Sequence, residues 1–169
     1  PYQRAIGGSR HWLLVLDDCS DFPMSFFMSH KDMLTSKMIP LIRYLRKRGI
    51  DVKIIRCDNA GENKAFEKEA EKQNMGLVFE YTVPGTPQQN GRVEHKFRTL
   101  YGRVRAMIFG GDLQLDYMKR LWTEAANTAT DLDGILVPPG ETLSSFQKFF
   151  GKGEKSNIEP TKKFGQRVI

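Results

Sequence analysis

The chain has 169 residues, of which 40% are hydrophobic and 27% charged, a composition typical of a globular protein that can bury one core. It contains no apolar run near the roughly 20 residues that a membrane-spanning helix needs, so no membrane partner is expected. Lysine and arginine number 26 against 20 aspartate and glutamate, a formal net charge of +6. This balance favours a polyanionic partner such as a nucleic acid.

The first half of the chain predicts strands and helices in alternation. Apolar residues dominate 10–18 and 22–28, which indicates two neighbouring strands joined by a turn. Ser29 and Asp32 have the spacing of a capping box at the start of a helix, and Gly49 follows its last apolar residue. A third strand at 52–57, a charged helix at 62–75 closed by Gly76, and a fourth strand at 77–81 follow.

The second half predicts helices. A loop rich in glycine and proline, residues 84–91, leads into a helix whose buried side comprises Val93, Leu100, Val104 and Ile108. One further helix, 115–129, carries several alanines that favour close packing. The order predicts a mixed α/β domain at 1–135, followed by an irregular segment at 136–169 with one short helix near 143–150.

Two carboxylates stand at positions suited to metal binding. Asp58 directly follows the strand 52–57, and Glu94 lies in the first turn or so of the helix after the loop. Two carboxylates at a strand end and a helix start can hold a pair of Mg²⁺ ions about 4 Å apart, the arrangement that metal-assisted phosphoryl transfer uses. An aspartate after a strand is also a common turn former or helix cap.

The residues around both carboxylates resemble one family. The segments RCDNAGE (56–62) and PGTPQQNGRVEHKFRTL (84–100) resemble the integrase core of copia-type LTR retrotransposons. The interval of 35 residues between the two acids is similar to the D,D-35-E pattern of retroviral-type integrases. LLVLDDCSDF (13–22) and LWTEAANTATDL (121–132) resemble further stretches of that core, so the resemblance spans nearly the whole chain.

The resemblance implies an RNase H-like fold, a mixed sheet flanked by helices, in which Asp58 and Glu94 are catalytic residues and metal ligands. The cofactor would be a pair of Mg²⁺ or Mn²⁺ ions, and the reaction the processing of DNA ends and their joining to target DNA. The family's first aspartate lies on the central strand. Alignment of Pro1 with the family motif places that strand and aspartate upstream of Pro1, so residues 1–169 alone are expected to be inactive.

The implied partners are double-stranded DNA, both the element's ends and the target, and other integrase protomers. Synthesis within a polyprotein in the cytoplasm and action in the nucleus are likewise implied. In the family, the loop that corresponds to 84–91 lies over the DNA end. The resemblance therefore implies that the side-chain amides of this loop and basic residues of the next helix bind nucleic acid. The residues assigned in this way are Gln88, Gln89, Asn90, Arg92, Lys96, Arg98 and Arg105.

Glu94, Arg98, Tyr101 and Arg105 recur at spacings of four, three and four residues and therefore form one stripe along the helix. Phosphates running away from the scissile bond would suit this stripe, although solvated helix faces also carry such clusters. A second basic cluster lies at 43–48. Asp17 and Asp18 could bind a metal or act as polar residues at the end of a hairpin.

Two other functions stay open. The first is a non-catalytic remnant of an integrase that keeps the fold and the basic surface, and the second is an RNase H-like nuclease acting on RNA–DNA hybrids. Several positions depart from the family's usual residues, including Gly85, His95 and Phe97. None of these departures removes a carboxylate.

Overall fold

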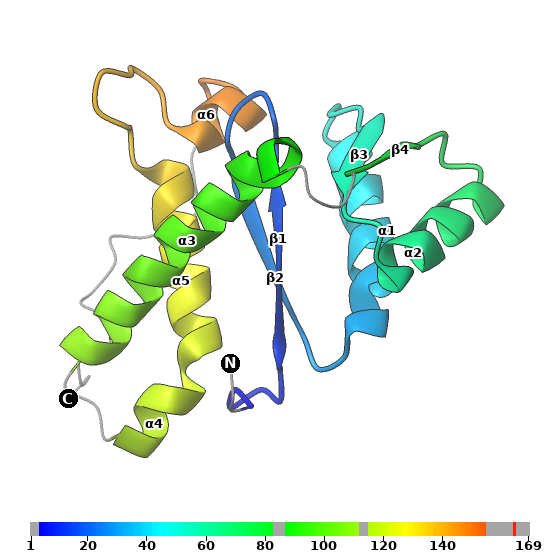
Figure 1. The fold of residues 1–169 in the computed structure, drawn as a ribbon. Coiled ribbons are helices and arrows are strands. Elements are labelled where there is room, and N and C mark those ends of the chain that lie inside the picture. The colour runs from blue at the N-terminus through cyan, green and yellow to red at the C-terminus, as the bar shows by residue number, and fades with distance from the viewer. Residues whose placement is uncertain (1–3, 83–86, 112–114, 155–163, 165–169) are drawn as a thin grey trace. The chain divides into compact units, whose positions relative to one another are not determined.

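The computed structural model describes residues 4–82, 87–111, 115–154 and 164. The chain divides into two compact units, drawn in Figure 1. Unit 1 comprises Pro1–Phe27 and Val93–Ile169, and unit 2 comprises Met28–Arg92. Each unit has its own pair of hydrogen-bonded strands, β1 with β2 and β3 with β4. In the part of the chain that is described, no helix is both long and apolar enough to span a bilayer.

The strands of unit 1 form a hairpin. β1 (His11–Leu16) and β2 (Pro23–Met28) are hydrogen-bonded neighbours, as predicted, and a connection this short requires the antiparallel direction. The Asp17 amide donates to the Phe22 carbonyl at 3.1 Å. The Asp17 Oδ2 atom accepts hydrogen bonds of 2.7 Å from both the amide and the hydroxyl of Ser20. Asp17 therefore stabilises the turn, as a hairpin-end residue does.

Helices pack beside this hairpin (Figure 1). They are α3 (Pro87–Gly110), α4 (Leu115–Arg120), α5 (Trp122–Ile135) and α6 (Ser145–Phe150). The prediction of one helix over 115–129 was wrong, since Leu121 separates α4 from α5. The buried cluster of α3 and α5 consists of Leu100, Val104, Ala125, Ala126 and Ala129. Small side chains on α5 let the two helices approach closely, as the alanine pattern predicted.

A polar chain of hydrogen bonds ties the hairpin to α5. The Trp12 indole donates to the Ser25 hydroxyl at 2.8 Å, and the Ser25 and Thr130 hydroxyls lie 2.6 Å apart. Thr130 in turn donates to the Ala126 carbonyl at 2.8 Å. These partners satisfy hydroxyl groups that would otherwise be buried without a hydrogen bond.

The predicted short helix near 143–150 is α6, and within unit 1 it packs against the hairpin turn. Ser144 caps it in a capping box with Gln147. The Phe22 ring contacts those of Phe146, Phe149 and Phe150, with centroids 5.0 to 5.9 Å apart. Aromatic rings therefore fix the segment after α5 to the hairpin turn, while the domain boundary predicted at residue 135 stays a prediction.

Unit 2 is built around a parallel strand pair. β3 (Ile54–Cys57) pairs with β4 (Val78–Tyr81) in parallel, with Ile54 opposite Val78, and α2 (Gly61–Lys72) makes the crossover between them. The Phe79 ring meets that of Phe66 on α2 edge-on, with centroids 5.1 Å apart. Phe66 is almost fully buried, so β4 and α2 share one small core.

The remaining helix of unit 2 is α1 (Leu34–Lys47), preceded by the 3-10 turn η1 (Lys31–Met33). The predicted capping box was wrong, because η1 begins after His30 without a side-chain cap and the Ser29 hydroxyl bonds the Met33 sulfur instead. The end at Gly49 is confirmed. Gly49 has φ +79°, and amides 49 and 50 bond carbonyls 46 and 45, which is a Schellman motif.

The end of α2 differs from the prediction. Asn74, with φ +50°, takes the left-handed position there, and Met75 donates to the Ala70 carbonyl at 3.0 Å. Gly76 lies two residues further on. Asparagine tolerates this conformation because its short polar side chain can compensate for the steric cost.

Candidate metal and nucleic-acid site

Asp58 lies at the carboxyl end of β3, as predicted. Its Oδ1 atom accepts a hydrogen bond of 2.6 Å from the Asn63 side-chain amide and one of 3.3 Å from the Ala60 main-chain amide. Asn63 also donates to the Asp58 carbonyl at 3.1 Å. Asp58 is exposed, and among the described residues no donor meets Oδ2. One oxygen therefore forms the turn into α2, while none of the described residues donates to the other.

Two titratable groups lie next to Asp58. Burial raises the pKa of the Cys57 thiol to about 11, and the negative charges of Asp58 and Glu67 add to the effect. The Tyr81 hydroxyl, opposite Cys57 in the strand register, donates to Glu67 at 2.6 Å. Burial, followed by this hydrogen bond, raises the pKa of Tyr81. Both groups are neutral at physiological pH, so carboxylates supply the charge at this end of the sheet.

Glu94 lies on α3, but further from the start of the helix than predicted. Residues 87–90 belong to α3, so the predicted loop is wrong over its second half and Glu94 lies about two turns after Pro87. Residues 83–86 and the side chains of Gln88, Gln89 and Asn90 lie outside the described part of the structure. Proline at the first position of a helix is favoured because it has no amide hydrogen to leave unpaired.

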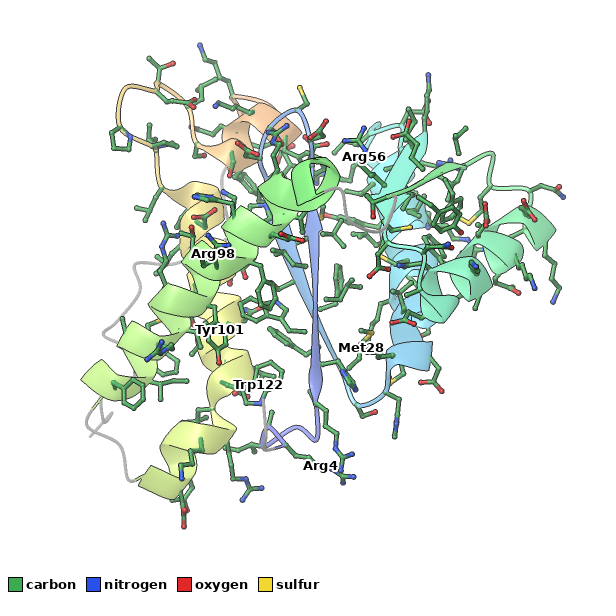
Figure 2. All side chains as sticks on the ribbon, in the orientation of Figure 1. Arg4, Met28, Arg56, Arg98, Tyr101 and Trp122 are labelled. Atoms are coloured by element: carbon green, nitrogen blue, oxygen red, sulfur yellow. The ribbon has the colours of Figure 1, made fainter. Side chains whose placement is uncertain are left out.

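The predicted stripe on α3 lies on the exposed side of the helix. Its four members are exposed, whereas Leu100 and Val104 on the opposite side are buried. Figure 2 labels Arg98 and Tyr101 on α3. Phe109, at 72% exposure, continues the same side of the helix four residues after Arg105. The stripe's members are Glu94, Arg98, Tyr101 and Arg105.

Lys96 lies on a different side of α3. Its Nζ atom is 2.7 Å from Asp133 Oδ2 on α5, and Arg103 Nη1 is 2.5 Å from Asp133 Oδ1. The side-chain exposure is 21% for Lys96 and 9% for Asp133. Arg92 is exposed on the first half of α3. Lys96 therefore has an intramolecular partner that the sequence did not indicate, whereas Arg98 and Arg105 face solvent.

The second basic cluster, at 43–48, contains structural contacts. Arg46 donates to the main-chain carbonyls of Val52 and Met75 at 3.0 and 2.7 Å, and Arg43 donates to the Gln73 side chain at 2.8 Å. These contacts join α1 to the start of β3 and the end of α2. At least half of this cluster serves the packing of unit 2.

Asp58 belongs to unit 2 and Glu94 to unit 1. Over the residues that the structure describes, no three side chains of His, Cys, Asp or Glu gather into a group that could hold a metal ion. Two residues that support the site were missed from the sequence, Asn63 and Asp133. Both act through contacts with residues that lie on other elements or turns, and an isolated motif does not reveal such contacts.

Comparison with known proteins gives a curated relative and a set of similar structures. The chain is 34% identical over 128 residues, 74% of its length, to the retrovirus-related Pol polyprotein from transposon TNT 1-94 of Nicotiana tabacum. It spans about a tenth of that polyprotein, 9% of its length. No family model matches the chain.

Two solved structures share the fold. One is the simian T-cell lymphotropic virus intasome in complex with the PP2A regulatory subunit B56 gamma, with a TM-score of 0.64 and 14% identity over 88% of this chain and 53% of that one. The other is the HTLV-2 integrase catalytic core domain in complex with magnesium, in its trimeric form, with a TM-score of 0.55 and 14% identity over 80% and 82%. The predicted RNase H-like fold is confirmed.

Proposed function

The chain belongs to the integrase catalytic cores of retrovirus-related Pol polyproteins, and we propose that it processes the DNA ends of a copia-type retrotransposon and joins them to target DNA. The reaction is a metal-dependent phosphoryl transfer. A water molecule or a DNA 3′-hydroxyl attacks a phosphodiester, one phosphorus–oxygen bond forms, and the bond to the leaving 3′-oxygen breaks.

The observation that carries this proposal is the position of two acids within their motifs. Asp58 ends a parallel strand and Glu94 lies on the exposed side of α3, and 35 residues separate them. At the carboxyl ends of parallel strands, side chains leave the sheet toward the position where α/β proteins bind ligands. We propose that both carboxylates bind one metal pair.

The donor chemistry fits Mg²⁺ or Mn²⁺. These ions prefer carboxylate oxygens, and the Asp58 Oδ2 atom, to which no residue in the described ranges donates, is available for one. Asn63 holds the other oxygen at 2.6 Å and thereby fixes the orientation of the carboxylate, as hydrogen bonds to metal-binding side chains do. When bound, the metal pair would stabilise the charge that develops on the attacking and leaving oxygens.

The chain's own residues would position the DNA. Arg98 and Arg105 extend from Glu94 along the exposed side of α3 and would bind phosphates on one side of the scissile bond. Arg92, Gln88, Gln89 and Asn90 belong to the same proposed surface, and Lys96 would contribute only if it left Asp133. Double-stranded DNA and further protomers are the proposed partners, and the nucleus is the proposed place of action, with synthesis in a cytoplasmic polyprotein.

The test is a strand-transfer assay with Mg²⁺ and with Mn²⁺, on a protein that includes the aspartate expected before Pro1. Asp58→Asn and Glu94→Gln should each abolish the joined product, because each removes a negative metal ligand while keeping the shape of the side chain. Asp51→Asn and Glu141→Gln, at exposed acids outside both motifs, are the matched controls and should keep full activity.

Three results would contradict the proposal. Undiminished activity in either motif variant would remove that acid from the metal site. DNA binding without any transfer by the unmutated protein would instead support the non-catalytic remnant. Transfer on RNA–DNA hybrids alone would favour the nuclease alternative.

A further inference from the structure

The exposed stripe of α3 includes an aromatic ring between two arginines. Tyr101 is 49% exposed and lies three residues after Arg98 and four before Arg105. A single exposed aromatic residue is ordinary on a protein surface. The neighbours of Tyr101 distinguish it, because two guanidinium groups that face solvent flank it on the same side of one helix.

The ring of Tyr101 stacks with another aromatic ring of α3, that of Phe97. Its plane lies 12° from that of Phe97, with centroids 6.4 Å apart. The centroid of the Phe97 ring is 4.7 Å from that of Trp12. Trp12 lies on β1, and its hydrogen bond to Ser25 on β2 holds it in place. A row of rings therefore runs from the hairpin to the surface. A supported aromatic side chain loses little conformational entropy when a ligand binds.

This combination suits a strand with an unpaired base. Proteins bind single strands with cationic groups that follow the phosphates and with aromatic rings on which bases stack. Arg98 and Arg105 are seven residues apart, about 10 Å along the helix axis, so a short stretch of backbone can contact both while one base covers the ring. A base inside a duplex already has neighbours on both faces and cannot stack on it.

We propose that Tyr101 stacks on an unpaired nucleobase of the DNA strand whose phosphates Arg98 and Arg105 bind. The chain would then prefer DNA with a frayed or single-stranded end to a blunt duplex. This inference rests on the proposed function, because that function makes DNA the partner of the stripe. It adds the chemical feature of the DNA that the stripe recognises.

The experiment measures binding of the full chain to two DNAs in buffer without divalent metal, so that no transfer occurs. One is a duplex with a short single-stranded overhang that carries the fluorescent base 2-aminopurine, and the other is the blunt duplex. The unmutated chain should bind the overhang more tightly and quench its fluorescence, since stacking quenches this base.

Tyr101→Ala and Tyr101→Leu should weaken binding to the overhang about tenfold, within the range for loss of one stacking ring, and abolish the quenching. Affinity for the blunt duplex should stay unchanged. Tyr101→Phe keeps the ring and should behave as the unmutated chain does. Tyr117→Ala, at a tyrosine on α4 that is somewhat more exposed than Tyr101, is the control for loss of any surface aromatic residue.

The outcomes separate the inference from the proposed function. Equal losses on both DNAs, or none on either, would overturn the stacking role while DNA binding stands. Failure of the unmutated chain to bind either DNA would overturn the proposed function as well. Loss of quenching in Tyr101→Phe would assign the effect to the hydroxyl and overturn stacking too.

Discussion

Acidic side chains serve different purposes in this chain, and their partners decide which. Asp17 accepts two hydrogen bonds inside the hairpin turn, and Asp133 binds two cations. Asp58 and Glu94 are exposed. Because all four are ordinary acids in the sequence, only the surrounding motifs could single out the last two.

Asp131 on α5 gives a pH-dependent prediction at this scale. Burial raises its pKa, and it accepts a hydrogen bond of 3.0 Å from Asn127. A raised folded-state pKa means that the charged form is disfavoured in the folded protein. Its contribution to stability is therefore fully present below the unfolded-state pKa and is lost as the pH rises through the folded-state pKa.

Asp131→Asn should accordingly raise the Tm at neutral pH, because it removes the cost of burying a carboxylate, and leave it unchanged at a pH below the ordinary aspartate pKa of 3.8. Thermal melts of both proteins across this range, followed by circular dichroism, measure the difference. A gain that is the same at every pH would show that charge is not the cause.

At the scale of the elements, two helical glycines make a matched pair. A Cβ atom at Gly134 on α5 would lie 2.9 Å from a ring carbon of Phe22, whereas one at Gly102 on α3 would meet nothing within 4 Å. Alanine gains about 1 kcal/mol over glycine in a helix interior, and overpacking costs about 1–3 kcal/mol.

Gly102→Ala should therefore raise the free energy of unfolding by up to about 1 kcal/mol, as helix propensity alone dictates. Gly134→Ala should leave it unchanged or lower it by up to about 2 kcal/mol, because the displaced Phe22 ring also contacts α6. Urea unfolding curves compare the two. A gain of equal size in both variants would mean that Phe22 has room to move.

The second prediction for the elements concerns the ionic contact between α3 and α5. Asp133→Ala should destabilise the chain by about 3 kcal/mol, since it leaves Lys96 and Arg103 without the carboxylate that compensates their partial burial. Asp51→Ala, at an exposed acid paired with Lys53 at 3.5 Å, should cost less than about 1 kcal/mol. Equal losses in chemical denaturation would show that the α3–α5 contact is no stronger than a surface pair.

The sequence predicted the elements better than their ends. All four strands and the long helices were found, because their apolar residues repeat at regular spacing. The starts of α1 and α3 were missed, since the Ser29 hydroxyl bonds the Met33 sulfur four residues further on and since the glycine- and proline-rich motif is helical from Pro87 onward. Helix ends are less regular than helix interiors, so local capping and loop signals predict them less well than apolar spacing predicts the elements themselves.

At the scale of the whole molecule, the motifs predicted the family, the fold and the positions of Asp58 at a strand end and Glu94 on a helix. The sequence did not predict which side chains pair with one another. Lys96 and Asp133 are 37 residues apart, and nothing in either neighbourhood indicates that they meet. A basic residue's availability for DNA depends on such long-range pairs, so charge counts along α3 overstate the cationic surface.

Unit 1 is assembled from two stretches of sequence that are separated by the whole of unit 2. The ribosome therefore synthesises β3, α2 and β4 before the buried half of α3. These three elements contact one another and are close together in the sequence. Until α3 and α5 emerge, the apolar side chains of the hairpin, Trp12 and Phe27 among them, have no helical cover. When the hairpin packs against α3 and α5, the chain between them, which includes unit 2, closes into a long loop. The entropy cost of closing this loop grows with its length. We therefore expect unit 2 to fold first during synthesis, and the hairpin to be the segment that most needs protection by chaperones while the chain is being made.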